Sequence, residues 1–301
     1  MPWSAADVPD QNGRRVVVTG ANSGIGFEAA KVLARKGARV VMACRSRERG
    51  EAAAGEIREG VPADATPPDL AVRRLDLADL ESVRSFPDRL DAEDRPVDVL
   101  ANNAGVMAIP RRETEDGFET QFGVNHLGHF ALTGVLFPDL AGDARVVTVS
   151  SGVHERGKID FADLHGEESY DRWGAYAQSK LANLLFAYEL DRRLDAAGSN
   201  VKSVGVHPGY ADTRLQIRGP EMSGSTVRKA MMHVANAVFA QSAADGALPT
   251  LYAATAPDVE GGEYYGPGGL LNMRGPPERQ RSSNRSYDRE TARRLWEVSE
   301  E

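Results

Sequence analysis

Two residues in the second half of the chain have the types and the spacing for proton transfer. Tyr176 and Lys180 lie four positions apart in a stretch, 173–194, whose apolar pattern predicts a long amphipathic helix. This spacing puts both side chains on one helix face. The ammonium there can stabilise the phenolate, lower the pKa of the tyrosine and make it a proton donor or acceptor near neutral pH. The same spacing also suits a solvated surface pair.

Other polar residues follow the ends of predicted strands, where open α/β sheets bind ligands. The run Asn-Asn-Ala-Gly at 102–105 follows one strand, and Ser150 and Ser151 follow the next. Ser151 can donate a hydrogen bond to a substrate oxygen, or the two hydroxyls can cap the strand end. Asn125 falls inside a predicted helix, where asparagine is unfavourable; a site role and a satisfied or solvent-facing amide are both open.

A glycine-rich turn near the start of the chain has the layout of a phosphate cradle. The apolar strand 16–18 is followed by Gly20, Gly24 and Gly26 and then by a helical stretch, 27–36. Gly20 permits a sharp reversal, Gly24 lets the backbone approach a pyrophosphate, and Gly26 lets the helix lie close to the strand. The helix N-terminus then presents free N–H groups to the anion. A tight turn without a ligand is the alternative.

Strands and helices alternate regularly, which predicts one doubly wound α/β (Rossmann) domain over 14–301 with a parallel seven-stranded sheet between helices. A loose arm, 1–13, precedes it, and 210–240 breaks the alternation. The expected strands are 16–18, 38–43, 70–75, 97–101, 144–149, 201–206 and 261–269. The expected helices are 27–36, 46–59, 79–90 with a kink or stop at Pro87, 119–137, 173–194, 242–254 and 288–298.

Composition excludes several classes of partner. With 36 Lys and Arg against 44 Asp and Glu, the net charge is −8, which argues against nucleic acid. Cys44 is the single cysteine, so no intrachain disulfide forms and no zinc cluster is expected. The start lacks a signal peptide and no apolar stretch is long enough to span a bilayer, so we expect a cytoplasmic protein. The histidines at 126, 129 and 207 are interpreted as structural, and His154 as a loop residue, with a place at the substrate entrance as the alternative.

These motifs occur together in one order. The chain resembles the short-chain dehydrogenase/reductase family, and within it the branch of retinol dehydrogenases and protochlorophyllide-reductase-like proteins. The motifs that carry the resemblance are Thr19–Gly26, Asp76-Leu77, Asn102–Gly105, Asn125, Ser151, Tyr176 with Lys180, and Pro208-Gly209. The branch is indicated by Asn125–Phe130, by Ser179–Asn183 and by the 25-residue gap between Ser151 and Tyr176.

The resemblance implies a role for each motif residue. Tyr176 is the general acid/base, Lys180 lowers its pKa and holds the nicotinamide ribose, and Ser151 orients the carbonyl group. Asn125 holds a water that connects Lys180 to solvent. The expected coenzyme contacts are Gly20, Asn22, Ser23, Gly24, Ile25, Gly26, Arg45, Asp76, Leu77, Asn102, Ala104, Gly105, Tyr176, Lys180, Pro208, Gly209 and Thr213.

The end of the second strand bears on the choice of coenzyme. An acidic residue there would bind a free ribose 2′-hydroxyl and repel a 2′-phosphate. This chain has Cys44 followed by Arg45, and a guanidinium fits phosphate oxygens. We therefore predict NADP(H), with NAD(H) as the alternative and a solvated Arg45 as the simpler interpretation.

The resulting prediction is an NADP(H)-dependent oxidoreductase that interconverts an alcohol and a carbonyl compound. A non-catalytic NADP(H)-binding regulator of the same fold is the alternative, and a light-dependent tetrapyrrole reductase is a third. Residues 210–240 are expected to form a substrate lid, in which Met222, Met231, Met232 and Phe239 favour a bulky apolar substrate. Pairing through the long helices, as a homodimer or homotetramer, is left open.

Overall fold

The structure is a computed structural model of the 301-residue chain. It describes residues 2–62, 66–90, 95–209, 242–269 and 272–301. The segment expected to form the lid, and with it Thr213, lies outside the described residues.

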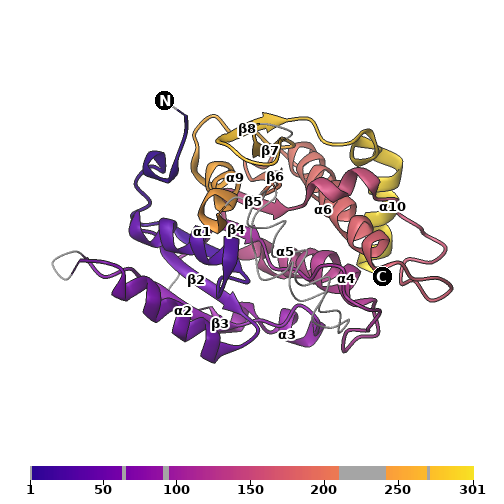
Figure 1. The fold of residues 1–301 in the computed structure, drawn as a ribbon, viewed down its shortest axis with the longest axis horizontal. Helices are drawn as coiled ribbons and strands as arrows, with labels where there is room; N and C mark the ends of the chain where they lie inside the picture. Colours follow the sequence, from indigo (N-terminus) through magenta and orange to yellow (C-terminus); the bar gives the residue numbers. More distant parts are fainter. Residues whose placement is uncertain (1, 63–65, 91–94, 210–241, 270–271) are drawn as a thin grey trace, which may run out of the picture.

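Eight strands form a single sheet in the order β3-β2-β1-β4-β5-β6-β7-β8 (Figure 1). Their bounds are β1 (Arg15–Thr19), β2 (Arg39–Cys44), β3 (Leu70–Arg74), β4 (Val97–Asn102), β5 (Leu140–Val149), β6 (Lys202–Val206), β7 (Tyr264–Pro267) and β8 (Pro277–Gln280). All neighbouring pairs from β3 to β7 are parallel, and only β7 and β8 are antiparallel. The strand order reverses between β1 and β4, which is where doubly wound sheets bind nucleotides.

The eighth strand corrects the prediction of a seven-stranded, wholly parallel sheet. β8 reads Pro-Glu-Arg-Gln and pairs Pro277 with Pro267 at one end. Proline and charged residues are typical of strands at a sheet edge. The polar sequence of β8 has no alternation of apolar residues, so the sequence pattern does not reveal it.

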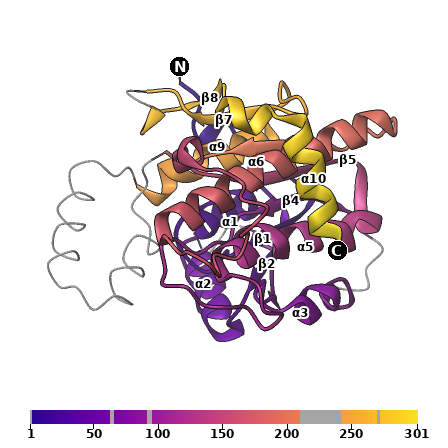
Figure 2. The ribbon, with the colours of Figure 1, turned by 90° about the vertical axis from the view of Figure 1, so that its right-hand side faces the viewer.

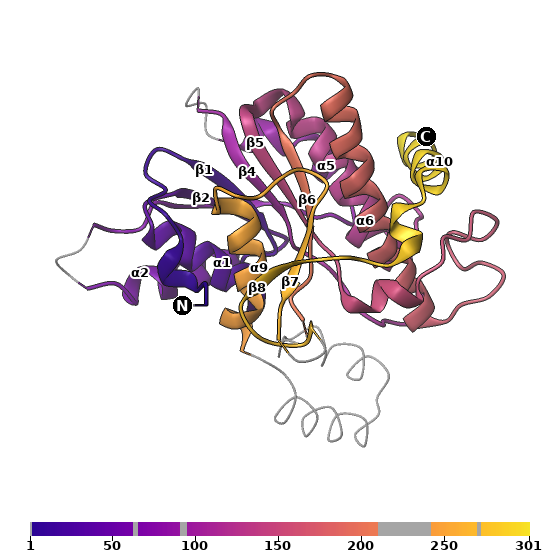
Figure 3. The ribbon, with the colours of Figure 1, turned by 90° about the horizontal axis from the view of Figure 1, so that it is seen from above.

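Helices cover both faces of the sheet (Figure 3). They are α1 (Gly24–Arg35), α2 (Arg47–Glu59), α3 (Leu80–Arg84), α4 (Thr120–Phe122), α5 (Gly128–Leu136), α6 (Arg172–Ala196), α9 (Ala243–Thr255) and α10 (Arg289–Glu300). Val16 and Val18 of β1 pack in the core with α1, α2 and α9, whereas Val17 packs in the core with α5 and α6. Alternate residues of a strand point to opposite faces, so β1 is buried on both.

Two helices differ from their predicted extents. The helix expected over 79–90 ends at Arg84 and is followed by a 3-10 turn at Pro87–Arg89, as the proline indicated. The helix expected over 119–137 consists of α4, a π-helical stretch at Gly123–Leu127, and α5. Such π-helical insertions are frequent at functional sites, and this one contains Asn125.

The N-terminal arm is not loose where the structure describes it. Val8 is buried, and the Lys36 ammonium donates to the carbonyl oxygen of Ala6 at 2.7 Å. The Trp3 ring meets that of Tyr252 edge-on, with centroids 5.1 Å apart. The arm therefore packs against α1 and α9, a tertiary contact that the polar sequence of the arm does not signal.

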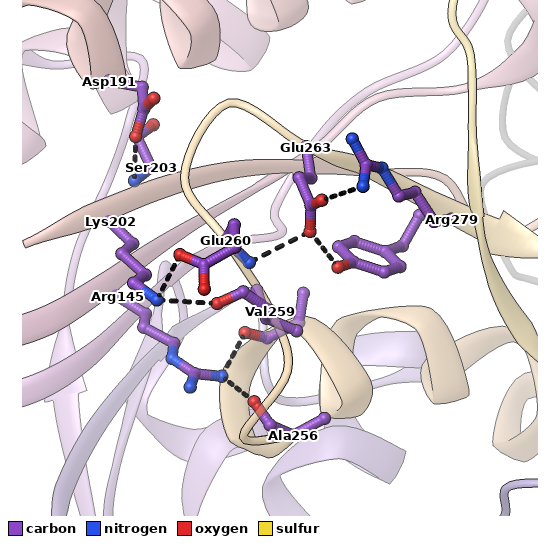
Figure 4. Close-up of polar contacts among 11 residues, drawn as sticks. Arg145, Asp191, Lys202, Ser203, Ala256, Val259, Glu260, Glu263 and Arg279 are labelled. Atoms are coloured by element: carbon purple, nitrogen blue, oxygen red, sulfur yellow. Dashed lines mark hydrogen bonds and ion pairs between the residues drawn. The ribbon is translucent and has the colours of Figure 1, made fainter.

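The C-terminal part of the chain is fastened to the sheet by polar contacts (Figure 4). Arg145 of β5 donates to the carbonyl oxygens of Ala253 and Ala256 at the end of α9, at 3.0 and 2.8 Å. Glu263 accepts from the Tyr265 hydroxyl and from the Arg279 guanidinium, so it joins β7 to β8. Helix α10 then lies against α6 (Figure 2).

Candidate active site

The glycine turn between β1 and α1 has the geometry of an anion cradle. Gly20 and Gly24 have φ angles of 68° and 58°, in the left-handed region that favours glycine. A Cβ on Gly26 would overlap the Asn103 side chain and lie 2.8 Å from the Gly20 carbonyl oxygen, so only glycine fits at this position in the first turn of α1. Ser23 makes no side-chain capping bond and the first helical turn has no acidic residue. The turn thus suits a pyrophosphate at the helix N-terminus.

Two further residues of this turn were predicted to contact the coenzyme. Asn22 is half-buried in the turn itself, whereas the Ile25 side chain is buried in the core beneath it. The structure therefore places Ile25 where its backbone, not its side chain, can face a ligand.

Thr19, which the sequence analysis named as part of a motif but gave no role, holds the turn after β4 in place. Its hydroxyl oxygen accepts the backbone N–H groups of Asn103 and Ala104, each at 2.9 Å. The Asn103 side-chain amide donates in return to the Thr19 carbonyl oxygen at 2.8 Å. Asn102 is buried and its side-chain amide donates to Thr133 Oγ1 of α5 at 3.0 Å. Asn102 thus supports the sheet, while Ala104 lies half-buried at the turn.

His129 of α5 connects this turn to the helix that carries Asn125. Its Nδ1 lies 3.0 Å from the Asn125 carbonyl oxygen and its Nε2 lies 2.9 Å from the Thr19 hydroxyl. A carbonyl oxygen only accepts, so Nδ1 carries the hydrogen and Nε2 accepts from Thr19. Burial, with the Lys180 ammonium nearby, lowers the pKa of His129 to about 4. The structural interpretation of this histidine is confirmed.

Asn125 links three elements through its side chain, which is fully buried. Its Oδ1 accepts the Val106 N–H at 2.8 Å, and its Nδ2 donates to the Val106 carbonyl oxygen and to Ser179 Oγ, each at 2.9 Å. The Ser179 hydroxyl donates to the Tyr176 carbonyl oxygen at 2.8 Å. The sequence left two interpretations of Asn125 open. In the structure its side-chain amide is buried and hydrogen-bonded, and it lies beside α6.

Tyr176 and Lys180 are both buried on one face of α6. The Lys180 ammonium lies 5.9 Å from the centroid of the Tyr176 ring and donates to the Val149 carbonyl oxygen at 3.0 Å. The Ser150 hydroxyl donates to the Lys180 carbonyl oxygen at 2.7 Å, which fixes α6 against the end of β5. The pair is therefore not a solvated surface pair, because Tyr176 is 6% and Lys180 4% exposed.

The electrostatics of this pair correct one prediction. Burial raises the pKa of Tyr176 to about 12, and a hydrogen bond from Ser151 counteracts only part of that increase. Burial also lowers the pKa of Lys180 to about 8. The expected lowering of the tyrosine pKa by Lys180 is wrong for the structure as described, because the desolvation of the phenolate outweighs the attraction of an ammonium held almost 6 Å from the ring.

The turn after β6 approaches the same edge of the sheet. Gly209 has a φ of 66° and a Cβ on it would overlap the Met273 carbonyl oxygen, so the position requires glycine. Its N–H donates to His207 Nδ1 at 3.2 Å, which confirms His207 as a residue that supports the backbone here. In the turn after β4, a Cβ on Gly105 would lie 3.0 Å from Asn125 Oδ1 and 3.6 Å from Lys180 Nζ. Gly105, Asn125 and Lys180 therefore converge.

The predicted contacts for the adenosine half lie at the ends of β2 and β3. Arg45 is exposed beside the buried Cys44, whose pKa is raised by burial to about 11. Asp76 Oδ1 accepts the Ala78 N–H at 3.1 Å, and the buried Leu77 packs against the start of α5. This region offers a guanidinium and no acidic residue directly after β2.

Thr19 and Ser179 were quoted within motifs in the sequence analysis, but their role in connecting those motifs was not predicted. Thr19 and Ser179 each bridge two site segments through a hydroxyl, as described above. Their positions directly before Gly20 and directly before Lys180 are the sequence signal that could have identified them.

A family model described as short chain dehydrogenase matches residues 14–223. The chain belongs to this family. The family model ends before β7, so the last two strands and α10 lie outside the match. The fold class and the resemblance inferred from the motifs are confirmed.

Two curated relatives show which members of the family this chain resembles. The chain is 42% identical to mouse (Mus musculus) retinol dehydrogenase 14 over 299 residues, which cover 96% of this chain and 85% of the relative. It is 43% identical to mouse polyprenol dehydrogenase over 297 residues, covering 96% and 83%. The protein is therefore an oxidoreductase of the short-chain dehydrogenase family, akin to retinol dehydrogenases.

Solved structures of similar proteins share the fold. An uncharacterised protein from Mycobacterium paratuberculosis superposes with a TM-score of 0.82 at 44% identity, covering 100% of this chain and 97% of that one. A Beutenbergia cavernae protein, described as an NAD(P)-dependent gluconate 5-dehydrogenase with bound NADP, gives a TM-score of 0.61 at 29% identity, covering 82% and 92%.

Proposed function

We propose that this protein is an NADP(H)-dependent oxidoreductase that interconverts a bulky apolar alcohol and its carbonyl compound, with Tyr176 as general acid/base. The observation that carries the proposal is that Tyr176 and Lys180 are buried on one face of α6 beside Ser151, with the ammonium 5.9 Å from the centroid of the phenol ring and bonded to the Val149 carbonyl oxygen. Three groups that can donate a proton thus converge at the carboxyl ends of the central strands.

Each of these residues has a task in the proposed reaction. Tyr176, protonated at neutral pH, donates its proton to the carbonyl oxygen during reduction, and Ser151 orients that oxygen with a hydrogen bond. Lys180 stabilises the phenolate that forms. Asn125 holds the loop at Val106 and is proposed to hold the water that returns protons to Lys180.

The glycine turn and α1 fit the pyrophosphate of a dinucleotide, as their positive φ angles and uncapped helix N-terminus indicate. When bound, the nicotinamide coenzyme supplies or takes the hydride. Arg45, with Arg47 at the start of α2, is proposed to hold the 2′-phosphate of NADP. The NADP bound to the Beutenbergia relative supports this choice.

The names of the relatives support an apolar substrate, since retinol and polyprenol are both long apolar alcohols. The structure adds one feature of the same kind. Trp173 at the start of α6 is 47% exposed, and its ring meets that of Tyr176 edge-on with centroids 6.2 Å apart. An exposed indole beside the proposed acid offers an apolar contact to a substrate.

The test is NADPH oxidation with retinal, a polyprenal and short polar carbonyl compounds, for the parent chain and for Tyr176→Phe. We expect turnover of the apolar aldehydes by the parent and a loss of at least about 100-fold in kcat for the variant, because the proton donor is removed. The affinity for NADPH, measured by fluorescence titration, should change little.

Turnover by Tyr176→Phe at the parent rate would refute the assignment of the acid. A parent chain that binds NADPH but reduces none of the carbonyl compounds would instead favour the non-catalytic regulator.

A further inference from the structure

A short C-terminal segment, residues 277–287, contacts two turns of the proposed active site. It consists of β8 and of a 3-10 turn at Asn284–Tyr287 that leads into α10. In Figure 1, β8 lies beside β7 at the edge of the sheet. It lies outside the residues that match the family model, 14–223, so the family match assigns it no role.

The first contact runs from β8 to Gly209. The Gly209 N–H donates to His207 Nδ1 at 3.2 Å, so this nitrogen carries no hydrogen and His207 is the Nε2–H tautomer. His207 Nε2 then donates to Gln280 Oε1 at 2.9 Å. The Gln280 amide donates in turn to the Pro267 carbonyl oxygen at 2.8 Å, which fixes its orientation. Gln280 thereby fixes the orientation of the His207 imidazole, and His207 in turn fixes the Gly209 turn.

The second contact runs from Ser283, in the linker between β8 and the 3-10 turn, to Ser151. His154 Nδ1 lies 2.7 Å from the Ser151 carbonyl oxygen and must donate to it. His154 Nε2 accepts the backbone N–H of Ser283 at 3.1 Å. His154 is 1% exposed, so no solvent contact competes with these two bonds. The backbone N–H of Ser283 thereby fixes the orientation of the His154 ring, which donates to the Ser151 carbonyl oxygen.

One aromatic ring lies against both imidazoles. Tyr264 of β7 meets His154 edge-on with centroids 5.7 Å apart and is stacked on His207 with centroids 5.2 Å apart. A Cβ on Gly266 would overlap the His207 ring, so glycine permits this close packing. The two contacts are therefore parts of one packed unit.

We propose that residues 277–287 are a positioning element of the active site, which sets Ser151 through His154 and the Gly209 turn through His207. The proposal rests on the proposed function, in which Ser151 orients the carbonyl group, and on Gly209 being a coenzyme contact, as the family resemblance implies. Neither Gln280 nor Ser283 touches the reacting groups; both act through a histidine.

Ser283→Pro tests the contact to Ser151 with a minimal change. Ser283 has φ −64° and ψ 153°, which proline adopts without strain, so the substitution removes chiefly the N–H donor to His154. Ser283→Ala is the matched control, because it keeps that N–H and removes only a hydroxyl that has no hydrogen-bond partner among the described residues. We expect kcat of Ser283→Pro to fall about tenfold with the KM for NADPH unchanged, and Ser283→Ala to match the parent.

Gln280→Leu tests the contact to Gly209, with Arg279→Leu on the same strand as its control. The Arg279 side chain is 73% exposed and pairs with Glu263, away from His207. We expect the KM for NADPH to rise about tenfold in Gln280→Leu and to stay within twofold of the parent in Arg279→Leu. The proposal would be overturned if Ser283→Pro had the same kcat as Ser283→Ala and Gln280→Leu had the same KM for NADPH as Arg279→Leu.

Amide hydrogen exchange of the full chain keeps the test independent of turnover. Ser283→Pro should raise exchange at 150–156 and Gln280→Leu at 207–209, each relative to its control variant. If the parent reduces no carbonyl compound, the proposed function fails, and exchange alone decides whether the segment positions these turns. Unchanged exchange at both sites would overturn the positioning element even in an active enzyme.

Discussion

Lys180 and Tyr176 are buried deeply enough that the pKa of each side chain is shifted in the direction that favours its neutral form. The pKa of Lys180 falls to about 8 and that of Tyr176 rises to about 12, so near neutral pH the site holds an ammonium and a phenol. The phenol can therefore donate its proton to a carbonyl oxygen without first taking up a proton. As the pH rises, Lys180 therefore loses its proton before Tyr176 does.

We therefore expect kcat/KM for carbonyl reduction to be flat below pH 8 and to fall above it, as Lys180 loses the charge that stabilises the phenolate. A pH–rate profile between pH 6 and 10 measures this. In Lys180→Arg, whose guanidinium keeps its charge throughout this range, the decline should disappear even though the rate is lower. A decline at the same pH in both proteins would assign the titration to another group.

The coenzyme preference is also a property of single residues. Arg45→Asp places a carboxylate directly after β2, where it repels a 2′-phosphate and can accept from a ribose 2′-hydroxyl. We expect the ratio of kcat/KM for NADPH over NADH to fall by about 100-fold, roughly 3 kcal/mol of lost discrimination. Steady-state kinetics with both coenzymes give the ratio, and Arg45→Lys, which keeps a positive charge, should retain most of it.

Among the elements, the interrupted helix α4–α5 does the most to join the motifs. The π-helical stretch places Asn125 against Val106 and Ser179, while His129 in the following helix reaches back to Thr19. One helix therefore fixes the turns after β1 and β4 with respect to α6. A regular α-helix through this stretch would turn these side chains to other directions.

His129→Leu should loosen this arrangement, with His126→Leu as the control. Both histidines are 1% exposed, but His126 contacts Ser299 of α10 instead of Thr19. Each variant should lose about 1–3 kcal/mol of unfolding free energy, measured in urea, because the hydrogen bonds of a buried imidazole are removed. Only His129→Leu should also weaken NADPH binding, because Asn103 and Ala104 lose a fixed Thr19 hydroxyl. Equal binding in both variants would contradict this coupling.

For the whole molecule, the buried histidines set the response to acid. Burial lowers the pKa of His126 to about 3 and the pKa values of His129 and His207 to about 4. Unfolded histidine titrates near pH 6.5. Below that pH the unfolded chain binds protons that the folded chain does not, so the stabilisation present above pH 6.5 is lost as the pH falls toward 4.

We expect the free energy of unfolding to decline below pH 6.5, by up to about 1.4 kcal/mol per pH unit for each of the three histidines. Urea unfolding at pH 8, 6, 5.5 and 5 measures the slope. In His126→Phe the decline of the unfolding free energy with falling pH should be shallower by the contribution of one histidine. A variant with the parent's slope would show that carboxylates and other groups dominate the acid response.

Sequence patterns predicted the features that depend on neighbouring residues. The glycine turn, the proline stop after α3 and the spacing of Tyr176 and Lys180 are all local, and each was found where it was expected. The polar strand β8 was missed, because its place in the sheet depends on β7. The pKa of Tyr176 was predicted in the wrong direction, because the burial of its ring depends on packing between α6 and distant segments.

The single cysteine of the chain makes it convenient for spectroscopy. Cys44 is 1% exposed and its thiol keeps its proton far above neutral pH, so maleimide reagents should leave it untouched. A thiol introduced at the exposed position 173 would then be the one reactive group among the residues whose positions are described. A dye or spin label attached there would report directly on whatever approaches residue 176, with no need to remove a native cysteine.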